Sequence, residues 1–331
     1  MATSAPLRWQ WSRFGLGLLY AVPSLLVAPA DPRLALALSI GVLPAAAIGL
    51  PPRRRARAAI PLIGVLTAVG LLLGSALALV PVVAVPAIGA LSVLCCLAAA
   101  RSRAGHAALI LVLPMVGIGL SFPLSAASGW LAVFVVVGSV YAWLVSLLWP
   151  ERNTRPVPLP AVPRGRAMVL YGFLLGIAAA TAATIGFATG LTHVGWATAA
   201  VLLVMRPVRG QVVARSFGRA GAVLVGALAA AGVAALAPGG WGAGVAIAAA
   251  VACLCAVNES RWYVAPAFST FLVLTLLLCT SEVPPAERFL ERTLETLLGV
   301  GLALVFGALV PALLGMRGRS RQAREMVSTS V

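Results

Sequence analysis

Lysine is absent from this sequence, and all 24 of its basic residues are arginines. This absence excludes a Walker A nucleotide site, a Schiff-base enzyme and a protein-kinase site, because each of these needs a lysine. Acidic residues are also scarce, with eight in 331 residues, and there are only two histidines. The five cysteines lie in apolar stretches with no histidine or carboxylate at metal-ligand spacing. We therefore expect no metal site, no cofactor and no disulfide framework.

Charge of either sign is rare along the chain. Charged residues make up 10% of it, hydrophobic residues make up 61%, and the mean hydropathy is +1.05, whereas about a quarter of the residues of a soluble domain are charged. The apolar stretches are long enough to cross a hydrocarbon core as helices, and they lack the alternation of barrel strands. The sequence therefore predicts an all-α fold, a polytopic bundle of transmembrane helices whose partner is the lipid bilayer. The net charge of +16 does not indicate a nucleic-acid partner, because the arginines lie in short loops between apolar runs.

Twelve apolar runs between breakers are candidate membrane spans. They cover residues 14–30, 34–50, 58–79, 82–100, 106–122, 129–149, 167–189, 194–206, 217–236, 241–257, 262–280 and 289–315. The number stays open between ten and twelve, because one run is only 13 residues long, and Pro81 and Pro86 mark either one break or a re-entrant turn. The first run also resembles a signal peptide, with Ala28 and Ala30 in an A-x-A arrangement, although we favour a retained helix.

The loops between these runs alternate in charge. Arginines gather in one set of loops, which includes residues 51–57, 101–103, 151–166 and 206–219, and they are nearly absent from the other set. By the positive-inside rule, the arginine-rich loops face the cytoplasm. This arrangement predicts that both termini are cytoplasmic.

An arginine followed by glycines seven and thirteen positions later occurs once in each half of the chain. The two copies are Arg57-Gly64-Gly70 and Arg219-Gly226-Gly232. Each copy falls in the third of six runs, which favours two parallel six-helix repeats. The predicted organisation is a membrane half at residues 1–150, a cytoplasmic linker at 151–166, a second membrane half at 167–316 and a basic cytoplasmic tail at 317–331.

The second half resembles the fusaric-acid-resistance-like family, also called the aromatic acid exporter group, of bacterial inner-membrane proteins. The resemblance rests on four pieces: "GWATAAVLLVMRP" from 195, "ARSFGRAGAVLVGALAA" from 214, "NESRWYVAPAFSTFLVL" from 258 and "ERTLETLLGVGLALVFGALVP" from 291. Ala222 stands where the family usually has threonine, and Glu295 where aspartate is common. The resemblance implies efflux of small aromatic or amphiphilic anions across the bacterial plasma membrane.

Glu295 is the first candidate for function, because an ionisable residue inside a span is costly in lipid. It follows Arg292 by three residues at the predicted outer start of the last run. One interpretation is a static Arg292–Glu295 ion pair that anchors the helix. In the other, Glu295 takes and releases a proton while Arg292 attracts the carboxylate of an anionic substrate. Arg219, at the predicted cytoplasmic end of its helix, is a further candidate for coupling.

His193 lies in a predicted outer loop, where it is either a solvated loop residue or a proton relay at the mouth of a pathway. Trp196 beside it fits the aromatic belt at a membrane surface or a pathway wall. Thr198 and Thr270 line a polar path or bond back to their own helices. The remaining candidates are three glycines expected to pack helices closely: Gly226, Gly232 and Gly299.

These observations together favour a secondary transporter that uses the proton gradient to export small anions. A noncatalytic membrane subunit that scaffolds an envelope or efflux complex is the alternative. We do not expect an enzyme, because a transferase acting on lipid carriers usually needs loop carboxylates, and the few acids here mostly stand beside arginines. The sequence leaves open whether the chain forms a homo-oligomer or binds another membrane protein.

Overall fold

The computed structural model describes residues 8–151, 165–206, 211–236, 239–258, 264–280 and 284–313. Most of the predicted linker and the whole predicted tail lie outside these residues. Every regular element in the described part of the chain is helical, which confirms the all-α class.

Each of the twelve predicted runs contains helix. The elements are α1 Trp11–Val27, α2 Pro32–Gly41, α3 Leu43–Ile48, α4 Arg54–Arg57, α5 Ala59–Leu77, α6 Pro81–Arg101, α7 Arg103–Ala107, the π-helical turn η1 Ala108–Val112, α8 Leu113–Gly119, α9 Ala126–Leu147, α10 Arg166–Ala188, α11 Val194–Val204, α12 Val212–Leu236, α13 Gly240–Ala256, α14 Ala265–Thr280, α15 Pro285–Leu304 and the π-helical turn η2 Val305–Leu309. Six helical stretches in the described residues are long and apolar enough to cross a membrane, namely 54–77, 81–101, 126–147, 166–188, 212–236 and 286–313. The other runs form apolar helices of 10–17 residues.

Short polar and proline signals set where these helices begin. Asp31 caps α2, because its carboxylate accepts the backbone N–H groups of Arg33 and Leu34 at 2.9 and 3.0 Å. Ser125 and Ser128 form a reciprocal capping box at the start of α9. Pro81 stands in the first turn of α6, so the break between α5 and α6 is a turn between two separate helices.

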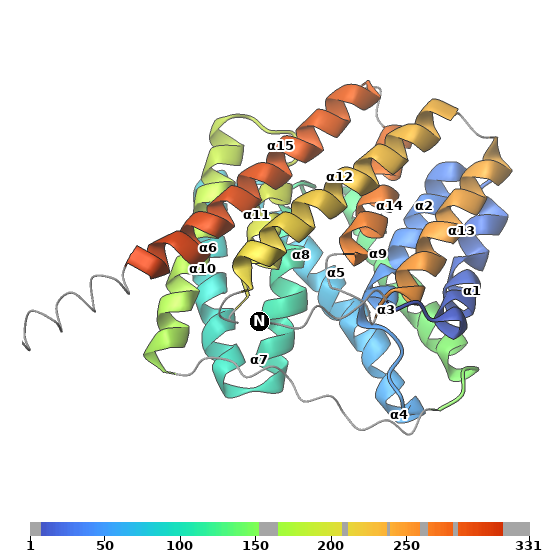
Figure 1. Cartoon of the computed structure of the whole chain (residues 1–331), viewed down its shortest axis with the longest axis horizontal. Helices are drawn as coiled ribbons and strands as arrows, with labels where there is room; N and C mark the ends of the chain where they lie inside the picture. Colours follow the sequence, from blue (N-terminus) through green and yellow to red (C-terminus); the bar gives the residue numbers. More distant parts are fainter. Residues whose placement is uncertain are drawn as a thin grey trace, which may run out of the picture.

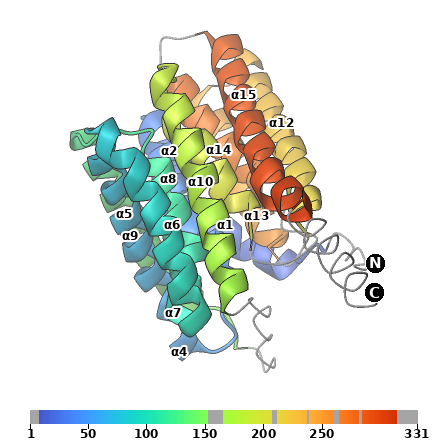
Figure 2. The same cartoon turned by 90° about the vertical axis from the view of Figure 1, so that its left-hand side faces the viewer.

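The two most extensively packed helix pairs lie on opposite sides of the bundle (Figure 1). On one side α10 packs along α6, and on the other α1 packs along α13. Gly17 permits close approach in the second pair, since a methyl group there would collide with the backbone of Ala252. Figure 2 shows α12 and α15 side by side, with α10 next to them.

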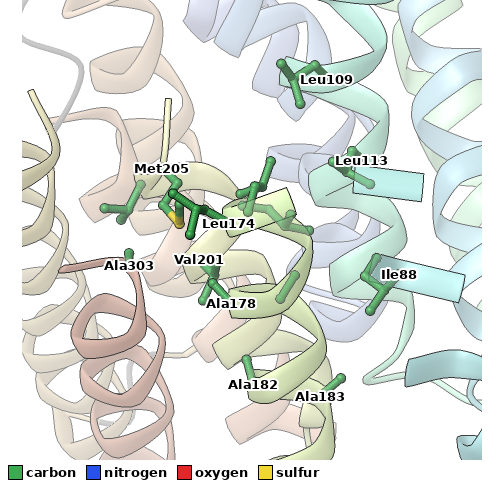
Figure 3. Close-up of a cluster of buried hydrophobic side chains, with 14 of the residues drawn as sticks. Ile88, Leu109, Leu113, Leu174, Ala178, Ala182, Ala183, Val201, Met205 and Ala303 are labelled. Atoms are coloured by element: carbon green, nitrogen blue, oxygen red, sulfur yellow. The ribbon is translucent and has the colours of Figure 1, made fainter. Parts of the chain in front are cut away.

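Two large apolar clusters and a small one between α5 and α9 form the core. The first joins α6, α8, α10, α11 and α15, and includes the fully buried Ile88, Leu113 and Val201 drawn in Figure 3. The second joins α1, α2, α3, α13 and α14, with contributions from α9 and α12. Many large apolar side chains on the outside of the bundle remain exposed, among them Leu66 and Val69 on α5 and Phe173 and Ile177 on α10. An apolar exterior of this kind is expected where lipid replaces water as the solvent.

The loops predicted to be cytoplasmic gather at one end of the bundle, here called the arginine-rich end. Arg57 there donates to the carbonyl oxygens of Pro51, Ser146, Trp149 and Pro150, so it caps the C-terminal end of α9. At the opposite end, Arg33 donates to the carbonyl oxygen of Cys279 at 2.9 Å. Pro29, before α2, likewise lies against Gly240 at the start of α13.

Candidate functional site

The strongest grouping of buried polar side chains lies where α15 packs along α11. Gly299 permits this approach, because a methyl group there would collide with the carbonyl oxygen of Ala197 and the side chain of Ala200. The two helices bring together the predicted candidates His193, Trp196, Arg292 and Glu295. Together with Arg288 and Glu291, these four residues are called the outer cluster, because they lie at the end opposite the arginine-rich end.

Trp196 is the centre of the outer cluster and is only 2% exposed. The imidazole of His193 stacks on its indole, with 4.2 Å between ring centroids and 9° between the planes. The guanidinium of Arg292 also lies over the indole, with its Cζ 4.2 Å from the ring centroid. Phe122, in the loop after α8, meets the His193 ring edge-on at 6.0 Å. A desolvated cation–π contact of this kind holds the guanidinium without using its donors on a carboxylate.

Glu291 joins His193 to Arg288. One carboxylate oxygen lies 3.0 Å from His193 Nδ1, and the other lies 2.7 Å from an Nη atom of Arg288. Burial lowers the pKa of His193 below its ordinary value of 6.5, and the hydrogen bond to Glu291 opposes part of this effect. A neutral His193 therefore donates from Nδ1 to the carboxylate.

The expectation of a solvated His193 was wrong. The side chain is 5% exposed, because Trp196, Phe122 and Glu291 enclose it. The aromatic-belt interpretation of Trp196 was also wrong, since this indole is buried between α11 and α15, whereas Trp130 and Trp241 are each 62% exposed.

Glu295 is 2% exposed and lies one helical turn further along α15 than Glu291. Neither of its carboxylate oxygens accepts a hydrogen bond from a side chain within the described part of the chain, although the backbone N–H of His193 faces the carboxylate. The charged groups that face it are Arg292, Glu291 and Arg288. Arg292 and Glu295 form no ion pair, because Arg292 lies over Trp196 instead. The predicted static anchor is therefore wrong in this structure, and Glu295 is a buried carboxyl group without a side-chain partner among the described residues.

Arg219 lies on α12 between the outer cluster and a second group of buried polar atoms, here called the inner group. The inner group consists of Arg206 at the end of α11, Tyr171 on α10 and His106 on α7. Arg219 Nε, Arg206 Nη1, the Tyr171 hydroxyl and His106 Nδ1 are all buried without a hydrogen-bond partner among the described residues. Sequence reasoning missed Arg206 and Tyr171, although the position of Arg206 between a short apolar run and a proline was a signal.

The two threonines among the candidates are buried. Thr198 is fully enclosed, and its hydroxyl lies 3.4 Å from the carbonyl oxygen of Val194 on its own helix. Thr270 is 3% exposed and lies against Gly226, which packs on the backbone of Ala267. Gly232 is exposed, with nothing within 4 Å of the place a methyl group would occupy. The packing predicted for Gly232 was therefore wrong within this chain.

An apolar groove of about 650 Å³ lies between α12, α13 and α14. The groove is lined by small and aliphatic residues, by the rings of Phe217, Phe268 and Phe271, and by the thiol of Cys253. Among the described residues, no acidic or basic side chain lines the groove, so this lining suits apolar groups. In the described parts of the chain, no three His, Cys, Asp or Glu side chains gather closely enough to hold a metal ion.

Comparison with curated proteins gave no match. Residues 168–306 match the model of a family described as fusaric acid resistance protein-like. The matched segment runs from α10 into η2, so it contains Tyr171, Arg206, Arg219 and the whole outer cluster. The second half of this membrane protein is thus similar to the fusaric acid resistance protein-like family, as its sequence resemblance indicated.

Proposed function

We propose that this protein is a secondary transporter of the bacterial plasma membrane that exports small aromatic or amphiphilic anions by using the proton gradient. The observation that carries the proposal is Glu295, a buried carboxyl group without a side-chain hydrogen-bond partner among the described residues, one turn from a guanidinium held on an aromatic ring. Intramembrane ionisable groups of this kind are typical of proton and substrate pathways.

The packing of the helices supports an architecture of twelve spans in two repeats. If six segments are counted from α1 and six from α10, each major contact of one half has a counterpart in the other. The matching pairs are α1–α13 with α10–α6, α5–α9 with α12–α15, α5–α8 with α12–α14, α2–α9 with α11–α15, and α2–α14 with α8–α11. The same correspondence between segments maps the helices of the first apolar cluster onto those of the second. Parallel repeats of this kind are common in secondary transporters.

The two repeats differ in their ionisable groups, which favours a site in the second half. α15 carries Arg288, Glu291, Arg292 and Glu295, whereas its counterpart α9 carries no charged side chain. The first half contributes apolar packing and Phe122 to the outer cluster. We therefore expect one substrate pathway along α11, α12 and α15.

The protonation state of Glu295 changes the net charge around Arg292, because the two residues lie one helical turn apart. An ionised Glu295 offsets the charge of Arg292, whereas a protonated Glu295 leaves that guanidinium available to a carboxylate of the substrate. Proton binding and anion binding are then thermodynamically linked, and each changes the affinity for the other by the same factor. This linkage makes anion binding depend on pH. Export driven by an inward proton gradient further requires that the proton and the anion cross the membrane in opposite directions, in separate steps of the transport cycle.

Purified protein in liposomes, with an imposed pH gradient and labelled benzoate, tests the proposal. We expect benzoate flux that depends on the gradient in the parent and is lost in Glu295→Gln. Glu287→Gln is the matched control, because Glu287 lies on the same helix but is exposed. Full transport by Glu295→Gln rejects the role of Glu295. Absence of flux in the parent, together with stable co-purification of another membrane protein, favours the scaffold alternative.

A further inference from the structure

Three arginines are spaced along the length of α11. Arg292 lies over Trp196 near the start of this helix, and Arg206 follows its end. Arg206 follows Trp196 by ten positions, which corresponds to about 15 Å along a helix. Arg219 interacts electrostatically with both Arg292 and Arg206, so it lies near both. The three guanidinium groups thus link the outer cluster to the far end of α11.

The inner part of this series has no negative charge to balance it. The charged neighbours of Arg219 are Arg292 and Arg206, and those of Arg206 are Arg215 and the Tyr171 hydroxyl. In the residues that the structure describes, no carboxylate faces Arg206 or Arg219. Arg206 and Arg219 are half-buried, but each has one guanidinium nitrogen that is buried without a partner among the described residues. Such a donor is costly unless an anion reaches it.

Arg57 shows how the same fold treats a buried arginine that has only a structural role. It is fully buried, and its donors reach four backbone carbonyl oxygens at the end of α9 and in the preceding loop. Arg219 Nε and Arg206 Nη1 are buried as well, but neither has such a partner among the described residues. The Tyr171 hydroxyl next to Arg206 is equally unpartnered. Three unsatisfied donors therefore converge on one region between α10, α11 and α12.

We propose that Arg206, Arg219 and Tyr171 form an internal binding site for the carboxylate of a small organic anion, on the cytoplasmic side of Arg292. The planar fork of an arginine matches the two oxygens of a carboxylate, and a phenol hydroxyl adds a third donor. The inference rests on the proposed function, since it names where the exported anion binds before it reaches the outer cluster.

Binding can be measured without any gradient, so the test is separate from the transport assay. Isothermal titration of benzoate into the full chain in detergent measures affinity, and a thermal unfolding scan measures stabilisation by the same ligand. We expect Arg219→Gln and Arg206→Gln each to weaken benzoate binding at least tenfold and to lose the thermal shift. Arg101→Gln, which alters an exposed arginine at the arginine-rich end, should bind as the parent does.

Variants that retain the parent affinity for benzoate would overturn the site, whether or not the protein transports. Inorganic phosphate is the second probe, and phosphate binding as tight as benzoate binding would overturn the assignment to a carboxylate. Removal of an unpaired buried charge should not lower stability, so we expect Arg219→Gln to unfold at or above the temperature of the parent in the absence of benzoate. If this variant does not fold, Arg219→Lys keeps the charge and removes the fork, and it should bind benzoate several-fold more weakly.

Discussion

Arg292 on α15 and Trp196 on α11 are joined by a cation–π contact, with 4.2 Å between the guanidinium carbon and the ring centroid. The contact holds a positive charge beside the buried Glu295 without an ion pair between the two residues. The outer cluster is thus organised around an aromatic ring, on which both His193 and Arg292 lie.

Replacement of Trp196 tests this organisation. Trp196→Phe keeps an aromatic face beneath Arg292, whereas Trp196→Leu removes it. We expect Trp196→Leu to be about 2 kcal/mol less stable than Trp196→Phe, which is the value of a desolvated cation–π contact. The measurement is the free energy of unfolding in mixed micelles. Equal stability of the two variants would show that the ring contributes only its volume.

Glu291 should contribute more to stability than Glu287 on the same helix. Glu291 accepts from both His193 and Arg288, so Glu291→Gln leaves a buried guanidinium with a weaker partner. We expect a loss of about 3 kcal/mol for Glu291→Gln and a change within about 0.5 kcal/mol for the exposed Glu287→Gln. Unfolding of both variants under the same conditions checks the difference. A neutral effect of Glu291→Gln would contradict the bridging role.

The two glycines of α12 should respond differently to one added methyl group. Gly226→Ala places a methyl group against the carbonyl oxygen of Ala267, so α12 and α14 must separate, which costs about 1–3 kcal/mol. Gly232→Ala meets open space and should gain up to about 1 kcal/mol from higher helix propensity. Thermal unfolding of both variants tests the pair. Destabilisation by Gly232→Ala would indicate that a second molecule covers this face.

The apolar runs predicted the helices well, because in lipid the length and hydrophobicity of a segment decide its structure. The prolines and small polar residues at 31, 81 and 125 also marked helix starts from local chemistry alone. The break between α2 and α3 also coincides with a proline, Pro44 in the first turn of α3, and Pro114 follows η1 in the first turn of α8. The predicted runs crossed both prolines without a break. The turn η2 has no proline or glycine cap at its start.

The repeated arginine–glycine spacing predicted a duplication but not the environment of each copy. Arg57 lies before α5 and is bound by carbonyl oxygens of the loop and of α9, whereas Arg219 lies two turns inside α12. Gly64 packs on α9 through Ser139, but Gly226 packs on α14. The same spacing is thus found with different contacts in the two halves, because each copy packs against a different helix.

The outer cluster was predictable only in part. The sequence predicted Glu295 and Arg292 as site residues because charges are rare inside apolar runs. The structure places both residues in one buried cluster. The burial of His193 was not predictable, since it depends on Glu291, almost a hundred residues away, and on Phe122 from the first half. The sequence analysis assigned Arg206 to the loop arginines that set the orientation of the spans, although its side chain lies near Tyr171.

Accessibility labelling tests the direction of the spans. Leu124 lies in the loop before α9 and Arg101 at the end of α6, and both are exposed in the structure. With a membrane-impermeant maleimide on intact cells, we expect Leu124→Cys to react and Arg101→Cys to react only after permeabilisation. The parent, which contains the exposed Cys279, gives the background. Labelling of both cysteines from the same side would contradict the crossing of the membrane by the run 106–122 that separates them.

The burial of His193 predicts a pH dependence of stability with a definite sign. Because burial lowers the pKa of His193 below 6.5, the unfolded chain binds a proton at a higher pH than the folded protein does. The folded state should therefore lose stability as the pH falls through 6.5, with a slope of at most about 1.4 kcal/mol per pH unit from this one group. His193→Asn keeps an amide donor toward Glu291 but does not titrate, so it should flatten this part of the profile. Unfolding of parent and variant between pH 7.5 and about 5 measures the slopes. An equal slope in the two proteins would show that His193 stays protonated in the folded state or that another group controls the acid limb.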